Sequence, residues 1–321
     1  MHCHLRDFGQ SAKGTVATET AAAFASGFGA VVVMPNTVPT VDCAEMVGRL
    51  LSQPASVTVY PVGAVSERLK GQVMTDFEAL ESAGAVAFSD DGAPVLDDNL
   101  LMTALREAKA LGKPLIYHSE LGPDEMNAEF ADVSRVVGLA GAVQAPVHVT
   151  HISDERSVQV IRAAKAAGIA VTCDTCPHYF SLTHRDFQRI GANARMNPPL
   201  KSKADVKAII AGLIDGTIDC ISTDHAPHTV ADKDGGANGI IGFETAFVVA
   251  YNELVLSGYM ALEDVVEKMR NHPARILGIP LPDGEFAFDE NVRWVMTEDD
   301  IVSKSKNSPW IGREFMGRIY G

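Results

Sequence analysis

The stretch VHVTHISDERSVQVIRAAKAAGIAVT, residues 147–172, decides the fold class. It begins with an apolar, β-branched run at Val147–Thr150, continues through a helical pattern and ends in a second such run at Ile169–Thr172. Ser153 can cap the helix at its start, and Gly168 can end it. A strand, a helix and a second strand in this order predict a parallel βαβ unit with a right-handed crossover.

The same alternation of short apolar runs and helical patterns extends over most of the chain. The runs are nearly continuously apolar, as expected of strands that are buried on both faces. Seven runs follow the first few residues and the stub Met1–Leu5 supplies an eighth, so we predict an α/β fold, a (β/α)8 barrel of the TIM type. The pattern changes after residue 276, which predicts a barrel domain over 1–276 and a reduced C-terminal accessory segment over 277–321. The seven runs are Ala30–Met34, Val57–Val62, Ala85–Phe88, Pro114–Tyr117, Val147–Thr150, Ile169–Thr172 and Ile218–Ser222.

The composition limits the classes of function. The chain has 321 residues and a net charge of −14, which argues against a nucleic-acid or anionic-membrane partner, since either would need a basic face. No apolar run approaches the roughly 18–20 residues of a membrane helix, and the start has no signal-peptide pattern. We therefore predict a cytoplasmic protein. A small anionic substrate stays open, because local arginines can dominate one pocket.

Polar side chains that can bind metal recur where the predicted strands end. In a (β/α)8 barrel the carboxyl ends of the strands meet at one rim, where such enzymes carry their active sites. Four histidines and two aspartates at these ends match the neutral imidazoles and anionic oxygens that a pair of divalent metals needs. These candidate ligands are His2, His4, Asp91, His118, His151 and Asp224.

The spacing of the first two histidines has a geometry of its own. Residues i and i+2 of a strand point to the same face, so the imidazoles of His2 and His4 can enter the barrel mouth together. His148 lies inside a strand and is predicted to be a core residue. His178 follows the seventh strand, and its sequence context fits a pocket-lining role and a structural role equally. His225 follows Asp224 directly and can orient the rim without touching metal.

Five sequence blocks together resemble the type I dihydroorotases, in the cyclic-amide hydrolase branch of the amidohydrolase superfamily. The segment Ser303–Pro309 is similar to that family's C-terminal segment, and the likeness extends over essentially the whole chain. The blocks are His2–Asp7 (HCHLRD), Met34–Thr37 (MPNT), Phe88–Gly92 (FSDDG), Met196–Leu200 (MNPPL) and Thr223–Thr229 (TDHAPHT).

The resemblance implies a site with two zinc ions. His2, His4 and Asp224 would hold one ion, His118 and His151 the other, and Asp91 would bridge them. Related cyclic-amide hydrolases use a carboxylated lysine as the bridge. No lysine lies between Lys70 and Lys109, so the carboxylate bridge of type I dihydroorotases fits this chain better than the hydantoinase arrangement.

The resemblance also implies a reaction, the reversible hydrolysis of dihydroorotate to carbamoyl aspartate in de novo pyrimidine (UMP) biosynthesis. A water between two zinc ions is acidic enough to attack the ring amide, and Asp224 would carry its proton to the leaving nitrogen as the catalytic base and acid. Arg6 offers a planar bidentate fork for the substrate carboxylate. A surface ion pair of Arg6 with Asp7 or Glu19 is the structural alternative. The implied substrate contacts are His4, Arg6, Asn36, Asn197, His228, Asn238 and Gly239.

The chain also departs from the family pattern. The N-terminal part of the family's β-sandwich domain is missing before His2, so the C-terminal tail is expected to lack strand partners. The family's Pro-Phe-Gly reads Ala237-Asn238-Gly239 here, which alters the expected pocket wall. An allantoinase-like or hydantoinase-like enzyme is therefore one alternative. A non-catalytic partner of aspartate carbamoyltransferase is another, although such homologues lose metal ligands. A homo-oligomer is compatible with the sequence.

Overall fold

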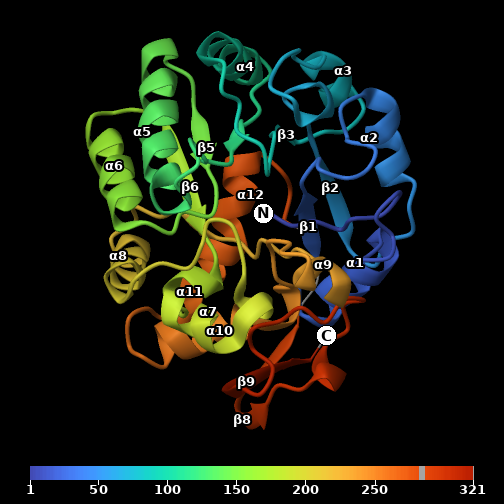
Figure 1. Cartoon of the computed structure of the whole chain (residues 1–321), viewed down its shortest axis with the longest axis vertical. Helices are drawn as coiled ribbons and strands as arrows, with labels where there is room; N and C mark the ends of the chain where they lie inside the picture. The colour runs from blue at the N-terminus through green and yellow to red at the C-terminus, as the bar shows by residue number, and fades with distance from the viewer. Residues whose placement is uncertain (282–285, 321) are drawn as a thin grey trace.

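The computed structural model describes residues 1–281 and 286–320, and it has the predicted alternation of strands and helices (Figure 1). Strands β1 to β7 form two parallel sheets, in the orders β1-β2-β3 and β4-β5-β6-β7. Isolated parallel bridges link the two sheets, from Phe88 to Leu115 at one junction and from Cys3 to both Val33 and His225 at the other. The N-terminal stub thus lies between β1 and the end of β7, in the eighth position of a (β/α)8 arrangement. The strands are β1 (Ala30–Val33), β2 (Thr58–Gly63), β3 (Ala87–Phe88), β4 (Ile116–Tyr117), β5 (Val147–Val149), β6 (Val171–Thr175) and β7 (Cys220–Ile221).

Helices enclose these strands from outside (Figure 1), and the hydrophobic core fills the layer between them. Helix α6 illustrates how the sequence specifies this packing, because Val158 and Ile161 are buried on its inner face. The predicted cap at Ser153 is wrong by one residue. Asp154 caps α6 by accepting the Arg156 N–H at 2.9 Å, whereas the Ser153 hydroxyl donates to the buried Glu129 at 2.5 Å. The helices are α1 (Val16–Ala25), α2 (Ala44–Leu51), α3 (Phe77–Ser82), α4 (Asp98–Ala110), α5 (Glu125–Val143), α6 (Glu155–Ala166), α7 (His184–Ile190), α8 (Lys203–Ile214), α9 (Val230–Asp234), α10 (Phe243–Ala250), α11 (Leu262–Met269) and α12 (Asn271–Leu277).

The C-terminal segment forms a two-stranded antiparallel ribbon at the lower end of Figure 1. Strand β8 (Ala287–Val295) pairs with β9 (Glu314–Tyr320). The prediction that this tail lacks strand partners is therefore wrong, because its two strands satisfy each other. Between them the chain returns to the barrel, where Ser303 and Asn307 are buried. The C-terminal segment thus forms the outer ribbon with its two strands and packs against the barrel with the residues between them.

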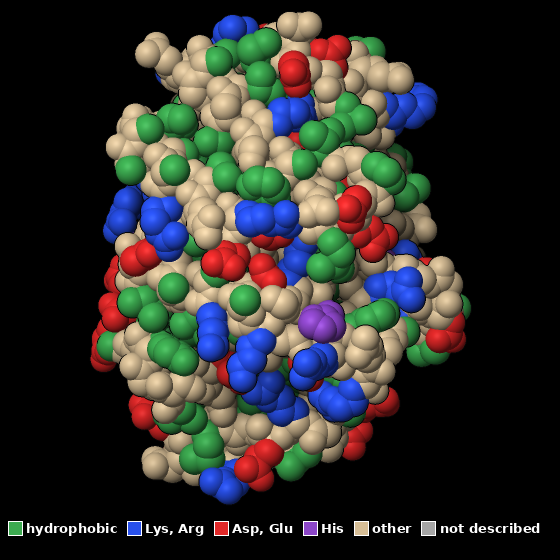
Figure 2. Space-filling model, turned by 60° about the vertical axis from the view of Figure 1, so that its left-hand side comes forward, with side chains coloured by type: hydrophobic (Ala, Val, Ile, Leu, Met, Phe, Trp, Pro, Cys, Tyr) green, Lys and Arg blue, Asp and Glu red, His purple; other side chains and the backbone are tan. Residues whose placement is uncertain are grey.

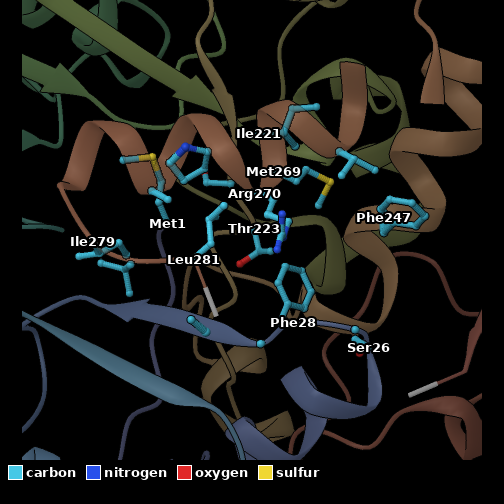
Figure 3. A pocket seen from close by; sticks show the side chains of 18 of the residues that line it. Met1, Ser26, Phe28, Ile221, Thr223, Phe247, Met269, Arg270, Ile279 and Leu281 are labelled. Carbon is cyan, nitrogen blue, oxygen red and sulfur yellow. The ribbon is translucent and has the colours of Figure 1, made fainter. Parts of the chain in front are cut away.

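A largely apolar cavity of about 230 Å³ lies beside Met1, at the start of the N-terminal stub (Figure 3). Met1, Val32 of β1 and Ile221 of β7 line it, together with side chains of α11 and α12 such as Met269 and Leu277. None of the candidate metal ligands lines this cavity. It is therefore separate from the polar rim described below.

The surface carries charges of both signs, and lysine and arginine side chains gather on the lower half of the face in Figure 2. The net charge of −14 is thus not spread evenly over the molecule. Among the described residues, no helix combines the length and the apolar character needed to span a membrane.

Candidate metal centre

Four histidines and an aspartate, from the N-terminal stub and the ends of three strands, form two groups suited to holding metal ions. The first group is His2, His4 and Asp91, and the second is Asp91, His118 and His151. Within each group the ligand atoms lie within 4.8 Å of one another, and all five residues are buried. Asp91 belongs to both groups. It therefore lies where a bridging carboxylate between two metal ions would have to lie.

Asp224 lies at the edge of the first group. The His4 Nε2 atom lies 3.1 Å from Asp224 Oδ1 and 3.5 Å from Asp91 Oδ2. The His2 Nε2 atom lies 3.3 Å from Asp91 Oδ1 and 3.5 Å from Asp224 Oδ1. Both imidazoles thus present the same ring nitrogen to the same carboxylates, as the i, i+2 spacing predicts.

The second group uses a different nitrogen on each histidine. The His118 Nδ1 atom lies 2.9 Å from His151 Nε2 and 3.5 Å from Asp91 Oδ1. The His151 Nε2 atom lies 3.7 Å from the same carboxylate oxygen. Three potential ligand atoms therefore surround one small space beside Asp91.

The backbone is strained at two of these positions. His151 has φ of 40° and Asp224 has φ of 44°, in the left-handed region that residues with a Cβ rarely adopt. Each lies just after the end of a strand, where the chain must turn sharply over the barrel rim. Strain of this kind persists only where the surrounding structure fixes it, and it is concentrated at functional sites.

The chemistry of the cluster fits metal ions. Among the described residues, the buried His2 Nε2 and Asp91 Oδ1 atoms lie 3.3 Å apart without the alignment of a hydrogen bond, and neither has another hydrogen-bond partner. Burial alone would lower the pKa of His118, but the neighbouring carboxylates of Asp91 and Glu120 raise it to about 10. Burial opposes ionisation of Asp224, yet the hydrogen bond with His4 and the charge of His2 hold its pKa well below the usual range. The site thus favours positive charge, which bound cations would supply.

Comparison with known proteins agrees with this geometry. A family model described as dihydro-orotase-like matches residues 1–130. The chain is 42% identical to a dihydroorotase of Geotalea daltonii, with 99% of this chain and 82% of the relative covered. It is 39% identical to a dihydroorotase of Acetivibrio thermocellus, with 99% and 83% covered. The chain belongs to the dihydroorotase family.

Solved structures of related folds agree with the barrel architecture. An L-hydantoinase (dihydropyrimidinase) from Arthrobacter aurescens superposes with a TM-score of 0.89 at 22% identity, covering 99% of this chain and 80% of the other. A dihydropyrimidinase from Brevibacillus agri NCHU1002 gives 0.86 at 20% identity, with the same coverage. At these identities the likeness concerns the fold alone. The fold of this chain is therefore of the same TIM type as in these two proteins.

Arg6 is a buried cation beside the dihydroorotase-family ligand cluster. Its Nε donates to the Pro227 carbonyl at 3.1 Å, and its Nη2 lies 2.9 Å from His228 Nε2. Burial and the neighbouring Arg6 charge lower the pKa of His228 to about 3, so the imidazole is neutral and can accept this hydrogen bond. Among residues 1–281 and 286–320, no carboxylate oxygen lies within 4.0 Å of the Arg6 guanidinium.

The alternative role for Arg6, a surface ion pair, is wrong. Its two suggested partners have other contacts. The Asp7 carboxylate accepts the N–H groups of Phe8 and Val16, and Glu19 pairs with His225 at 3.0 Å. The buried guanidinium therefore keeps donor capacity for an anion from outside the chain.

The other predicted substrate residues differ in their surroundings. The Asn36 side chain lies 2.8 Å from His4 Nδ1, so it contacts a candidate ligand directly. Asn197 donates to Glu120 at 2.9 Å. Gly239 is buried against His228, whereas Asn238 is exposed. His178 is buried and stacks edge-on against the Tyr179 ring.

Sequence reasoning missed several residues that support the ligands from behind. Glu120 lies 3.2 Å from His118 Nε2, so it can accept the proton that leaves Nδ1 free for metal. Thr150 acts similarly, because its hydroxyl lies 2.7 Å from His2 Nδ1 and donates to Asp174. Partners of this kind fix the tautomer and the ring orientation of a metal-binding histidine.

The Thr150→Val variant tests this support. Valine keeps the shape of threonine but removes the acceptor for the His2 Nδ1 proton, so we expect metal affinity to fall about 10- to 100-fold. Affinity is measured by competition with a chelator. Thr172→Val is the matched control, because the Thr172 hydroxyl contacts His148 and no candidate ligand. Equal metal affinity in Thr150→Val and the parent would contradict the assignment.

Proposed function

We propose that the chain hydrolyses the ring amide of dihydroorotate reversibly, giving carbamoyl aspartate. One observation carries the proposal: the buried Arg6 guanidinium, which has no carboxylate partner among the described residues, lies beside a cluster of candidate metal ligands. Dihydroorotate combines the two groups that such a site would recognise, a cyclic amide and a carboxylate. The family membership supports the same reaction.

We further propose two zinc ions as the resident metals. His2, His4 and Asp224 would hold one ion, His118 and His151 the other, and Asp91 both. Histidine nitrogens and carboxylate oxygens are ligands that zinc prefers. The membership of Asp91 in both groups supports the bridging role.

The chain's own residues account for proton movement and orientation. When bound, paired metal ions lower the pKa of water and polarise a carbonyl oxygen. As the water oxygen bonds to the ring carbonyl carbon, the Asp224 carboxylate takes a proton from it. The carbon–nitrogen bond of the ring then breaks, and Asp224 returns the proton to the leaving nitrogen. The acyl product is first a carboxylic acid, which releases the second proton of the water to solvent and becomes a carboxylate, and the leaving nitrogen becomes the carbamoyl nitrogen of the opened ring.

The substrate carboxylate would lie against Arg6. The Arg6 fork is already oriented by Pro227 and His228, so little of its conformational freedom is lost on binding. Asn36, Asn197, His228, Asn238 and Gly239 are the other proposed contacts. The exposure of Asn238 makes its contact the most dependent on loop position.

Metal analysis combined with an assay of dihydroorotate hydrolysis tests the proposal. We expect two zinc ions per chain and turnover that disappears on chelation and returns with zinc. Hydrolysis of dihydrouracil or a hydantoin as readily as dihydroorotate would favour an allantoinase-like or hydantoinase-like enzyme. A metal-free, inactive chain that binds aspartate carbamoyltransferase would favour the non-catalytic role.

A further inference from the structure

Lys233 is a buried lysine whose ammonium, among the described residues, is bound by backbone carbonyls alone. It lies in α9 (Val230–Asp234) and is 3% exposed. Its Nζ donates to the carbonyls of Arg195 at 2.9 Å, Ala237 at 2.9 Å and Gly239 at 2.7 Å. These bonds use all three protons of the ammonium group. Within the described part of the chain, no carboxylate oxygen lies within 4.0 Å of this Nζ.

The three carbonyls belong to two loops that carry proposed substrate contacts. Arg195 precedes Asn197 by two residues, while Ala237 and Gly239 flank Asn238. The loops also touch directly, because the Gly239 N–H donates to the Arg195 carbonyl at 3.0 Å. The ammonium therefore lies at the junction of two segments that are more than 40 residues apart in sequence.

The position of the Gly239 backbone affects Arg6 through His228. Gly239 has φ of 122°, and a Cβ there would lie 2.7 Å from the Ala226 Cβ and 3.2 Å from His228 Nε2. That Nε2 is the atom that contacts Arg6. A shift of the Gly239 backbone would therefore reach His228 and Arg6 through direct contacts.

An apolar side chain could fill the space of Lys233, yet a buried cation is present. Burial disfavours the charged form, and together with the Arg195 charge it lowers the pKa of Lys233 to about 8. Burying a cation is unfavourable unless hydrogen bonds compensate it. An apolar side chain would make no hydrogen bonds here, whereas the ammonium binds three carbonyls from two loops at the same time.

We propose that Lys233 is a positioning residue that holds the Asn197 and Gly239 loops around the substrate carboxylate. The proposal rests on the proposed function, because it assigns the loops to substrate binding. Lys233 itself does not touch substrate in this arrangement. It acts through the carbonyls of Arg195, Ala237 and Gly239.

The Lys233→Met variant removes the hydrogen bonds and keeps most of the volume. We expect KM for dihydroorotate to rise about tenfold or more and kcat to change less than about threefold, since contacts to the carboxylate act in the ground state and the transition state alike. Metal content should stay at the parent level, because no candidate ligand contacts Lys233. A fall in kcat with unchanged KM would overturn the proposal.

Lys268→Met is the matched control. Lys268 is also buried and donates to a backbone carbonyl, that of Ile218 at 2.7 Å. It lies on α11, however, and Ile218 precedes β7, whereas the candidate ligand Asp224 follows that strand. Both variants should lower Tm, and only Lys233→Met should raise KM. Unchanged KM in both variants would reduce Lys233 to a structural role and overturn the proposal.

Two further measurements cover a poorly folding variant and a failed function. In Lys233→Ala, n-propylammonium should restore KM, and tetramethylammonium, which cannot donate hydrogen bonds, should not.

Amide hydrogen exchange of the peptide 235–241 should be faster in Lys233→Met than in Lys268→Met and the parent. Exchange needs no substrate, so unchanged exchange refutes the positioning role. Changed exchange in a chain that does not hydrolyse dihydroorotate refutes the proposed function instead.

Discussion

Arg6→Ala should lower kcat/KM for dihydroorotate by about 10- to 150-fold, because a charge-assisted hydrogen bond to a carboxylate is worth about 1.5–3 kcal/mol. The guanidinium is buried and lies outside the candidate ligand groups, so both metal ions should remain bound. Arg6→Lys keeps the charge but loses the planar fork and should also cost activity. Steady-state kinetics and metal analysis on the same samples measure the two effects.

The control for charge loss is Arg49→Ala. The Arg49 guanidinium lies on the surface over the Phe8 ring, 4.5 Å from its centroid, and contacts no proposed site residue. This variant should keep the parent kinetics. Dihydrouracil lacks the carboxylate, so the parent should hydrolyse it poorly and Arg6→Ala should barely change that rate. If dihydrouracil is hydrolysed as well as dihydroorotate and Arg6→Ala is silent on both, the substrate assignment is wrong.

The fold and the candidate ligands follow from short-range features of the sequence. Apolar runs alternating with helical patterns predict parallel strands, and parallel strands bring their carboxyl ends to one rim. His2 and His4 converge because residues i and i+2 share a face of a strand. His118, His151 and Asp224 each follow a recognisable strand directly. Their meeting needs only the topology, without knowledge of side-chain packing.

The supporting residues could not be predicted in this way. Thr150 reaches Asp174 only because β5 and β6 pair in a register that sets His148 beside Thr172, and register is a property of the folded sheet. The cap of α6 illustrates the same limit, because Ser153 and Asp154 are equally good caps locally. Glu129, on a different helix, accepts a hydrogen bond from the Ser153 hydroxyl, and Asp154 is the residue that caps α6.

The Asp91→Asn variant should have the largest effect, because Asp91 belongs to both groups of candidate ligands. An amide can neither carry the negative charge nor bridge two cations with two anionic oxygens, so the affinity for both metal ions should fall. We expect activity to drop by more than the roughly 100-fold cost of losing an outer hydrogen-bond partner. His118→Ala, by contrast, removes a ligand of the second group only and should lose mainly one metal ion. Metal-to-protein ratios across a zinc titration distinguish the two patterns.

Asp90→Asn is the control that the sequence itself offers. Asp90 and Asp91 are adjacent, but the Asp90 carboxylate accepts the Ser66 N–H at 2.9 Å and the Ser66 hydroxyl, and it belongs to neither candidate ligand group. Its replacement should cost stability through the Ser66 contacts and leave two metal ions per chain. If Asp90→Asn loses the metals and Asp91→Asn keeps them, the bridge is assigned to the wrong aspartate. If both variants keep parent affinity, neither carboxylate bridges, and the two histidine pairs must hold their metals without a shared anion.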